Sequence, residues 1–231
     1  TALEVAGSGC EFTFDLNGAS LFGGTAFALT GTNQTLTVVN NGPSQYNPKI
    51  EAKTIVAMGS GSTVTFNGNN IRFYPQTALV DFADDATATM QVNINGGTYR
   101  IVGPQGNVLD IDQPHASVTI TAGEIGNTDV TLYAVSVSNH GKLRVTGDSS
   151  NTKFTGIFDS LWVKDATADV KLSGGSYKSI LYDGKSAPGL HLDLLADGYA
   201  FYERDGRLID LAENSGPNLG APDDVSVMAH S

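Results

Sequence analysis

Four aspartates, a lysine and the only tryptophan of the chain stand between or just after the two apolar residues of short alternating segments. If each apolar pair points inward, the residue between its members and the residue after it point outward. The first outward row is Asp81, Asp110, Ser136, Trp162 and His191, and the second is Ala83, Asp112, Ser138, Lys164 and Asp193. We therefore predict a binding face formed by Asp81, Asp110, Asp112, Ser136, Trp162, Lys164, His191 and Asp193.

Such carboxylates could hydrolyse a glycosidic bond. Asp110 and Asp112 stand two residues apart on one strand, or about 7 Å, within the range of about 6.5–9.5 Å that inverting glycosidases use. Asp81 and Asp110 on adjacent strands would be about 5 Å apart, near the retaining geometry. A lyase would need Ca²⁺ and a base, for which Lys164 is the candidate. Alternatively, Trp162 beside carboxylates could be a platform for a sugar ring, or the face could simply be solvated.

The elements that must position these residues are short strands that recur along the chain. The first column has inward pairs 24, 28, 28, 26, 25 and 27 residues apart: Phe12/Phe14, Leu36/Val38, Val64/Phe66, Val92/Ile94, Val118/Ile120, Leu143/Val145 and Val170/Leu172. The second column is Val80/Phe82, Leu109/Ile111, Val135/Val137, Leu161/Val163 and Leu190/Leu192. A third, weaker column is Ile71/Phe73, Tyr99/Ile101, Ile125, Phe154 and Tyr177/Ile180.

Three strands in each near-constant period predict an all-β solenoid, a parallel β-helix of about seven coils of 24–29 residues. A β-sandwich is the second candidate, but it would not require matched inward pairs at a fixed period. We expect four segments: an N-terminal capping coil over 1–31, the parallel β-helix over 32–193, a C-terminal hairpin cap over 194–212 and an irregular tail over 213–231. Asp205-Gly206 supplies the tight turn of the hairpin, and the tail is rich in Gly, Pro and Asn.

The composition excludes several classes of partner. The chain has 13 basic and 24 acidic residues among its 231, and its net charge of −11 argues against binding to nucleic acid. No apolar run is long enough to insert into a membrane. With Cys10 as the only cysteine, no internal disulfide can form.

Other possible sites have weaker signals. Thr35/Thr37, Thr63/Thr65 and Thr119/Thr121 form an outward row of the kind found in flat ice-binding solenoids, but threonine is also common in strands for packing reasons. The acidic turn at Asp81, Asp84 and Asp85 could hold Ca²⁺, although a solvated turn is the simpler interpretation. We expect no other metal or cofactor, because no His or Cys spacing, phosphate loop or dinucleotide fingerprint is present.

The ending Gly174-Gly-Ser-Tyr177, followed by Leu194-Leu-Ala-Asp-Gly-Tyr-Ala-Phe-Tyr202, resembles the ends of repeat regions in large bacterial surface proteins of the adhesin type. The coils as a whole resemble the pectin-lyase-like superfamily of single-stranded, right-handed parallel β-helices. That superfamily contains adhesins, phage tailspikes, and polysaccharide lyases and hydrolases. The resemblance implies a protein located outside the cell, on a cell surface or on a virion surface.

The leading prediction is a non-enzymatic structural or adhesive module that binds glycan or partner subunits through flat faces and can assemble into oligomers or filaments. The alternative is a polysaccharide lyase or glycoside hydrolase that uses Asp81, Asp110, Asp112 and Lys164.

Overall fold

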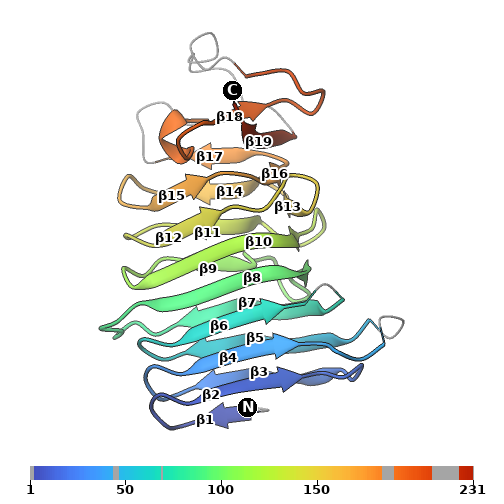
Figure 1. Ribbon diagram of the computed structural model, residues 1–231, viewed down its shortest axis with the longest axis vertical. Helices are drawn as coiled ribbons and strands as arrows, with labels where there is room; N and C mark the ends of the chain where they lie inside the picture. The colour runs from blue at the N-terminus through green and yellow to red at the C-terminus, as the bar shows by residue number, and fades with distance from the viewer. Residues whose placement is uncertain (1–2, 44–46, 69, 184–189, 210–223, 231) are drawn as a thin grey trace.

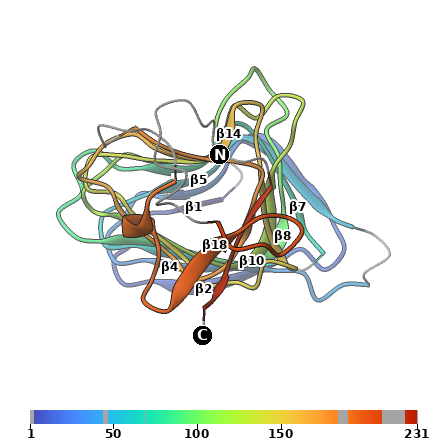
Figure 2. The ribbon, with the colours of Figure 1, turned by 90° about the horizontal axis from the view of Figure 1, so that it is seen from above.

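A computed structural model shows an all-β protein wound into a solenoid of about seven turns, which confirms the predicted fold class (Figure 1). The structure describes residues 3–43, 47–68, 70–183, 190–209 and 224–230. The turns stack along the long axis from the N-terminus at one end to the C-terminus at the other. Viewed down this axis, they superpose around one interior (Figure 2).

The first column is one continuous parallel ladder, and we call its outward surface the first face. It comprises β2 (Glu11–Asp15), β4 (Thr35–Val39), β6 (Thr63–Asn67), β8 (Met90–Tyr99), β10 (Ala116–Gly126), β12 (Lys142–Val145) and β15 (Asp169–Leu172). The register places Phe12, Leu36, Val64, Val92, Val118, Leu143 and Val170 in one row. The seven pairs predicted from the sequence are therefore in register, and from Leu36 onward they are buried.

In each turn of the solenoid, the strand of the third column follows that of the first column along the chain. It uses the first halves of β3 (Leu21–Leu29), β5 (Lys49–Met58) and β7 (Arg72–Phe82), the second halves of β8 and β10, and then β13 (Thr152–Thr155) and β16 (Ser176–Tyr177). Aromatic rings stack inside it, with centroids 4.6 Å apart for Phe73 and Tyr99 and 4.7 Å apart for Phe154 and Tyr177. Each buried tyrosine hydroxyl donates to a corner carbonyl, Gly96 O at 2.6 Å from Tyr99 and Gly174 O at 3.0 Å from Tyr177.

Close backbone contact explains the glycines between the first and third columns. A Cβ on Gly174 would lie 1.9 Å from the carbonyl oxygen of Gly147 in the preceding turn. A Cβ on Gly147 would lie 2.1 Å from the carbonyl oxygen of Thr121. Neighbouring turns thus pack backbone against backbone at this corner, where no side chain fits.

The second column positions the candidate site, and it is interrupted. It starts with β1 (Leu3–Val5) and the second halves of β3, β5 and β7. It continues in a separate parallel sheet of β9 (Leu109–Ile111), β11 (Tyr133–Val137), β14 (Asp159–Val163) and β17 (Ile180–Tyr182). Among the described residues, β7 and β9 are not paired as a ladder, although Leu79 N–H donates to Val108 O at 3.0 Å.

The prediction that Leu190 and Leu192 close the second column was wrong. Ile180, which the sequence predicted for the third column, pairs with Leu161 in their place. Leu192 is 66% exposed at the start of the short 3₁₀ turn η2 (Leu192–Leu194). The cause is a short corner, because only Lys178 and Ser179 separate β16 from β17. This shortening was not visible in the sequence, because Leu190 and Leu192 stand ten positions after Ile180 and Tyr182 and have a similar apolar pattern.

Antiparallel strands close the C-terminal end. The turn at Asp205-Gly206 forms as predicted, with Gly206 at φ +84° and Glu203 N–H donating to Arg207 O. However, β18 (Tyr199–Tyr202) pairs mainly with β19 (Val225–Ala229), which also pairs with β16. The predicted irregular tail over 213–231 therefore contains a strand, and its residues 213–223 and 231 lie outside the described residues.

Candidate ligand-binding ledge

Three aromatic side chains meet on the outside of the four-stranded sheet, and we call Tyr133, Phe158 and Trp162 the aromatic ledge. The Tyr133 and Trp162 rings stack with centroids 4.5 Å apart and planes at 29°. The Phe158 ring lies 5.9 Å from that of Tyr133 and is 60% exposed. Tyr133 begins β11, Trp162 lies in β14, and Phe158 immediately precedes β14, so rigid paired strands carry the ledge.

A carboxylate and an ammonium group flank the ledge on the N-terminal side. Lys164 Nζ donates to Asp110 Oδ1 at 2.8 Å and lies 5.1 Å from the centroid of the Trp162 ring. The Ser136 hydroxyl donates to the same Asp110 oxygen, and Asn107 Nδ2 donates to the Ser136 hydroxyl at 3.2 Å. Asp110 is therefore held from two sides through Oδ1, while its side chain remains 46% exposed.

Asp183 flanks the ledge on the C-terminal side. The indole N–H of Trp162 donates to Asp183 Oδ2 at 2.7 Å. Asp183 directly follows β17, whose Leu181 is the strand neighbour of Trp162. This bond orients the indole, and the cation–π contact with Lys164 restrains it further.

The surroundings of the ledge are acidic. Partial burial, and next the charge of Asp110, raise the pKa of Asp112 above its usual range. Burial, and then the charges of Asp159 and Asp183, raise the pKa of Tyr133. Both shifts show that a further negative charge is disfavoured at this surface.

The structure brings together four of the eight residues predicted for the binding face. These are Asp110, Ser136, Trp162 and Lys164, with Asp112 two residues further along the chain. Ser136 is 0% exposed, so it supports Asp110 from below and offers no surface of its own. Lys164 forms an ion pair with Asp110. This geometry favours a role in holding the Asp110 carboxylate in place over the role of base that a lyase would need.

The other three predicted residues lie elsewhere. His191 and Asp193 belong to the segment around η2, because β17 takes the strand position expected for residues 190–192. His191 contacts Tyr182, with ring centroids 5.2 Å apart. Asp81 lies on β7, beyond the interruption of the second column, and lines a separate groove.

Tyr133, Phe158 and Asp183 were missed in the sequence. Strict alternation from Val135 would point Tyr133 inward, but it stands at the strand start, where the turn of the solenoid sets its direction. Phe158 lies in a corner outside the inward–outward pattern. Asp183 would have been found by testing Ile180 and Tyr182, instead of residues 190–192, as the last inward pair.

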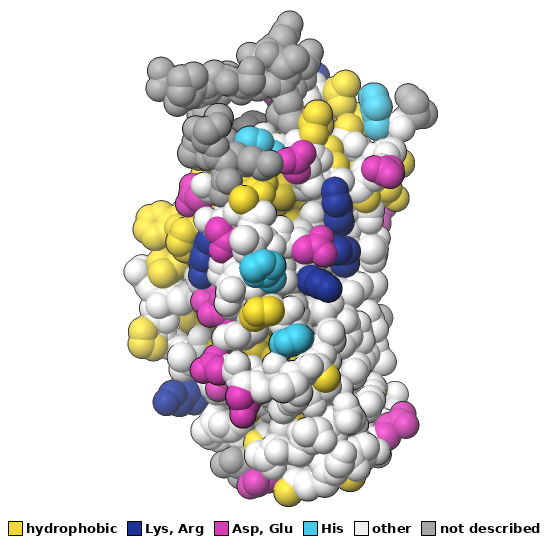
Figure 3. Space-filling view, turned by 90° about the vertical axis from the view of Figure 1, so that its left-hand side faces the viewer, with side chains coloured by type: hydrophobic (Ala, Val, Ile, Leu, Met, Phe, Trp, Pro, Cys, Tyr) yellow, Lys and Arg dark blue, Asp and Glu magenta, His cyan; other side chains and the backbone are white. Residues whose placement is uncertain are grey.

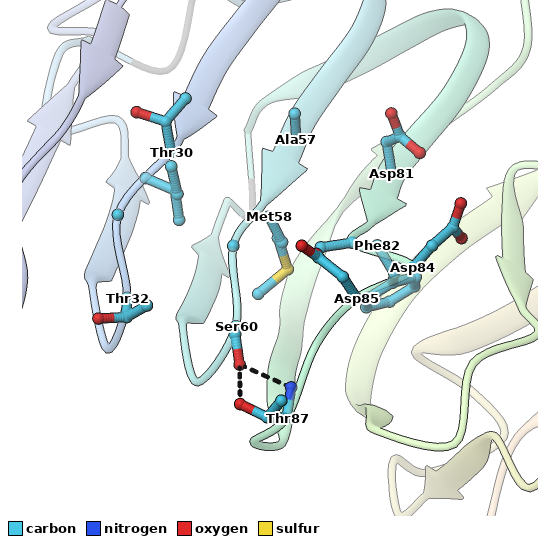
Figure 4. A pocket seen from close by; sticks show the side chains of 14 residues that line it. Thr30, Thr32, Ala57, Met58, Ser60, Asp81, Phe82, Asp84, Asp85 and Thr87 are labelled. Carbon is cyan, nitrogen blue, oxygen red and sulfur yellow. Dashed lines mark hydrogen bonds between the residues drawn. The ribbon is translucent and has the colours of Figure 1, made fainter.

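The groove that contains Asp81 has a volume of about 650 Å³ and opens between the turns of the N-terminal half (Figure 4). Thr30 and Thr32 line one side, and Asp81, Asp84 and Asp85 line the other. Asp84 accepts a hydrogen bond from Gln113 Nε2 at 2.7 Å. In the described part of the chain, no three His, Cys, Asp or Glu residues form a group that could hold a metal ion.

Acidic side chains also lie along the long axis of the solenoid, beyond the ledge (Figure 3). On the face shown in Figure 3 they form a row along the long axis, with most of the basic side chains in its upper half. Within the described ranges, no helix is long and apolar enough to span a bilayer.

Comparisons with known proteins do not assign a family. No family profile and no solved structure matches the chain. Over 121 residues it is 28% identical to the electron transfer subunit of dihydroorotate dehydrogenase B (NAD(+)) from Clostridium perfringens (strain 13 / Type A). The match covers 51% of this chain and 45% of that protein, so the chain spans about half the length of this curated relative.

The name of that relative mentions NAD(+), but the present chain lacks features that dinucleotide sites use. Its sequence contains no G-x-G-x-x-G fingerprint. Its described residues form no α-helix whose N-terminus could face a pyrophosphate. A match of 28% identity over 51% of the chain therefore assigns neither a family nor the relative's activity to it.

Proposed function

We propose that this protein is a non-enzymatic, glycan-binding adhesive module of a cell or virion surface, and that the aromatic ledge is its binding site. The observation that carries the proposal is the stacked pair of Tyr133 and Trp162 on the outside of a rigid parallel sheet. Large aromatic side chains at a surface indicate a binding site, because burying them stabilises a complex.

The chemistry of the ledge suits a sugar. The C–H face of a pyranose ring is apolar and packs on an aromatic ring, while its hydroxyl groups point sideways as hydrogen-bond donors. Asp110 and Asp183 lie on either side of Trp162 and present carboxylate oxygens as acceptors. An apolar platform with a few convergent polar groups is the usual composition of a ligand site.

The scaffold suits an adhesive role. Each turn contacts its neighbours through parallel ladders, so the solenoid is a stiff rod that presents the ledge at a fixed position. From the solenoid architecture we also propose, by analogy alone, membership of the pectin-lyase-like superfamily and a location outside the cell. At the N-terminal end, β1 and β2 each pair with one neighbour only, and their open edges would also allow assembly with partner subunits.

A glycan array followed by calorimetric titration of the best ligand tests the proposal. We expect Trp162→Ala to weaken binding by about 10- to 100-fold, the effect expected for loss of a stacking platform. Asn93→Ala on the first face is the matched control and should bind as the unmodified protein does. Equal affinity for all three proteins, or no glycan ligand at all, would overturn the proposal.

The polysaccharide hydrolase or lyase remains a second candidate for one reason. Asp112 has a raised pKa and stands two residues from Asp110, which pairs with Lys164, and acid–base pairs in glycosidases likewise have unequal surroundings. Release of reducing ends or unsaturated products, lost in Asp110→Asn and in Asp112→Asn, would establish the enzymatic function. Intact oligosaccharide after prolonged incubation would support binding alone.

A further inference from the structure

The charges around the aromatic ledge are unequal. Asp110 and Asp183 lie beside Trp162. Among the described residues, Lys164 contacts the Trp162 ring and its ammonium group is paired with Asp110, while Lys178 lies at the corner before Phe158, with its Nζ 3.5 Å from Gly156 O. The described cation that contacts the rings of the ledge is thus already paired.

The two flanking carboxylates lie at different heights along the solenoid. Asp110 is in register with Ser136, which is in register with Trp162, and Trp162 is in register with Leu181 on the strand that leads to Asp183. Three strand spacings therefore separate the turns of Asp110 and Asp183, about 14 Å along the axis. A ligand that reaches both carboxylates must contain more than one sugar ring and must lie along the stack, across Trp162.

Each flanking carboxylate keeps some capacity to accept hydrogen bonds. Asp110 receives its bonds from Lys164 and Ser136 on Oδ1, and Asp183 receives the indole N–H on Oδ2. A carboxylate has about four lone-pair sites, so a ligand donor can approach the second oxygen of either group. An ammonium donor at that position would form a charge-assisted hydrogen bond, whereas a carboxylate would meet a like charge.

We infer that the ledge selects a glycan with free amino groups, and that it discriminates against glycans that carry uronic acids. This inference rests on the proposed glycan binding and specifies its ligand class. A neutral glycan of the same backbone should bind with intermediate affinity, because it keeps the stacking on Trp162 and the hydroxyl donors but gains no charge interaction.

The test compares oligosaccharides of equal length on one β-1,4-linked hexose backbone that carry free amino, N-acetylamino, hydroxyl or C6-carboxylate groups. At about pH 5.5 and low salt, a carboxyl group of ordinary pKa is ionised and sugar amines are protonated. We expect the amino form to bind about five- to tenfold more tightly than the neutral forms, and the carboxylate form more weakly than either. Raising the salt to about 1 M should reduce these differences, because exposed charges are then screened.

Variants separate a local effect from the net charge of the protein. Asp183→Asn keeps an oxygen acceptor for the indole N–H, and it should reduce the preference for the amino form severalfold while leaving binding of the N-acetyl form unchanged. Glu11→Gln removes one charge from an exposed position of the first face and should leave the preference unchanged. Equal or tighter binding of the carboxylate form would overturn the inference but not the proposed function, and absence of binding to all four would overturn both.

Discussion

The first face and the aromatic ledge are built on parallel strands of the same solenoid, but their outward side chains make different contacts. On the first face, polar side chains bind one another across turns. Asn93 Nδ2 donates to Thr65 Oγ1 at 3.2 Å, and Gln91 Nε2 donates to Asn93 Oδ1 at 3.1 Å and to Thr119 Oγ1 at 3.3 Å. On the ledge, stacked rings stand between carboxylates that have acceptor sites left.

Charge follows the same division. On the first face, the hydrogen bond from Arg144 Nη2 at 2.6 Å is the main cause that lowers the pKa of Asp169, so this carboxylate is satisfied within the fold. Near the ledge, the pKa of Asp112 is raised by partial burial and by its acidic neighbour. A surface whose polar groups satisfy one another stabilises the stack, whereas a surface with unmatched charge and exposed aromatic rings is suited to a ligand. Perturbing the first should cost stability, and perturbing the second should cost binding.

The largest expected effect is on stability, at the corner beside the first face. Gly174→Ala places a Cβ 1.9 Å from the Gly147 carbonyl oxygen, so neighbouring turns must move apart. We expect unfolding in urea to show a loss of about 1–3 kcal/mol, typical of overpacking. Gly23→Ala is the control, because its Cβ has no atom within 4 Å. Equal stability of the two variants would contradict the close packing of this corner.

Removal of an exposed ring should separate binding from stability. Phe158→Ala deletes a side chain that is 60% exposed at the edge of the ledge. We expect severalfold weaker glycan binding and a change in the free energy of unfolding within about 0.5 kcal/mol. Phe22→Ala removes a ring that is 58% exposed on β3, and it should leave binding intact. Equal losses of affinity in both variants would show that the ledge is not a specific site.

High pH should destabilise the interior of the fold through two tyrosines. Burial raises the pKa of Tyr99 and of Tyr177 well above the ordinary value of about 10. The folded state then keeps protons that the unfolded state loses, so stability is fully present below about pH 10 and falls as the pH rises further. The double variant Tyr99→Phe, Tyr177→Phe should flatten this decline in urea titrations between about pH 9 and 11. An unchanged slope would contradict burial of the phenols.

The smallest effect is expected within the first-face ladder. Asn93→Ala removes bonds to Thr65 and Gln91 that are partly exposed, and we expect a loss of about 0.5–1 kcal/mol in urea unfolding. Glycan affinity should not change. A larger effect on affinity than on stability would reverse the roles assigned to the two surfaces.

Much of the fold could be predicted from the sequence, because a parallel solenoid repeats its register. The pairs from Phe12/Phe14 to Val170/Leu172 indicated the first column, and Phe73, Tyr99 and Phe154 indicated the third. The end of the second column could not be predicted in this way. There a two-residue corner brings Ile180 forward, while residues 190–192 have a similar apolar pattern and a plausible spacing.

The candidate site was predicted only in part, for a related reason. Alternation correctly directs Asp110 and Trp162 outward, since both lie between inward residues of regular strands. Tyr133 and Phe158 stand at corners, where alternation carries no information about direction. The hydrogen bond from Trp162 to Asp183 could not be predicted, because it requires β17 instead of residues 190–192 as the last strand of the second column. The burial of Ser136 could not be predicted either, because it is linked to the hydrogen bond from Ser136 to Asp110.

Fluorescence of Trp162 tests the central claim most directly, because the chain contains no other tryptophan. Any change in the emission spectrum on adding ligand therefore reports on the ledge itself. We predict that an amino-bearing oligosaccharide shifts and changes the emission with a midpoint equal to the dissociation constant from calorimetry. Calorimetric binding with no change in Trp162 emission would contradict the account, because the glycan would then bind elsewhere on the protein.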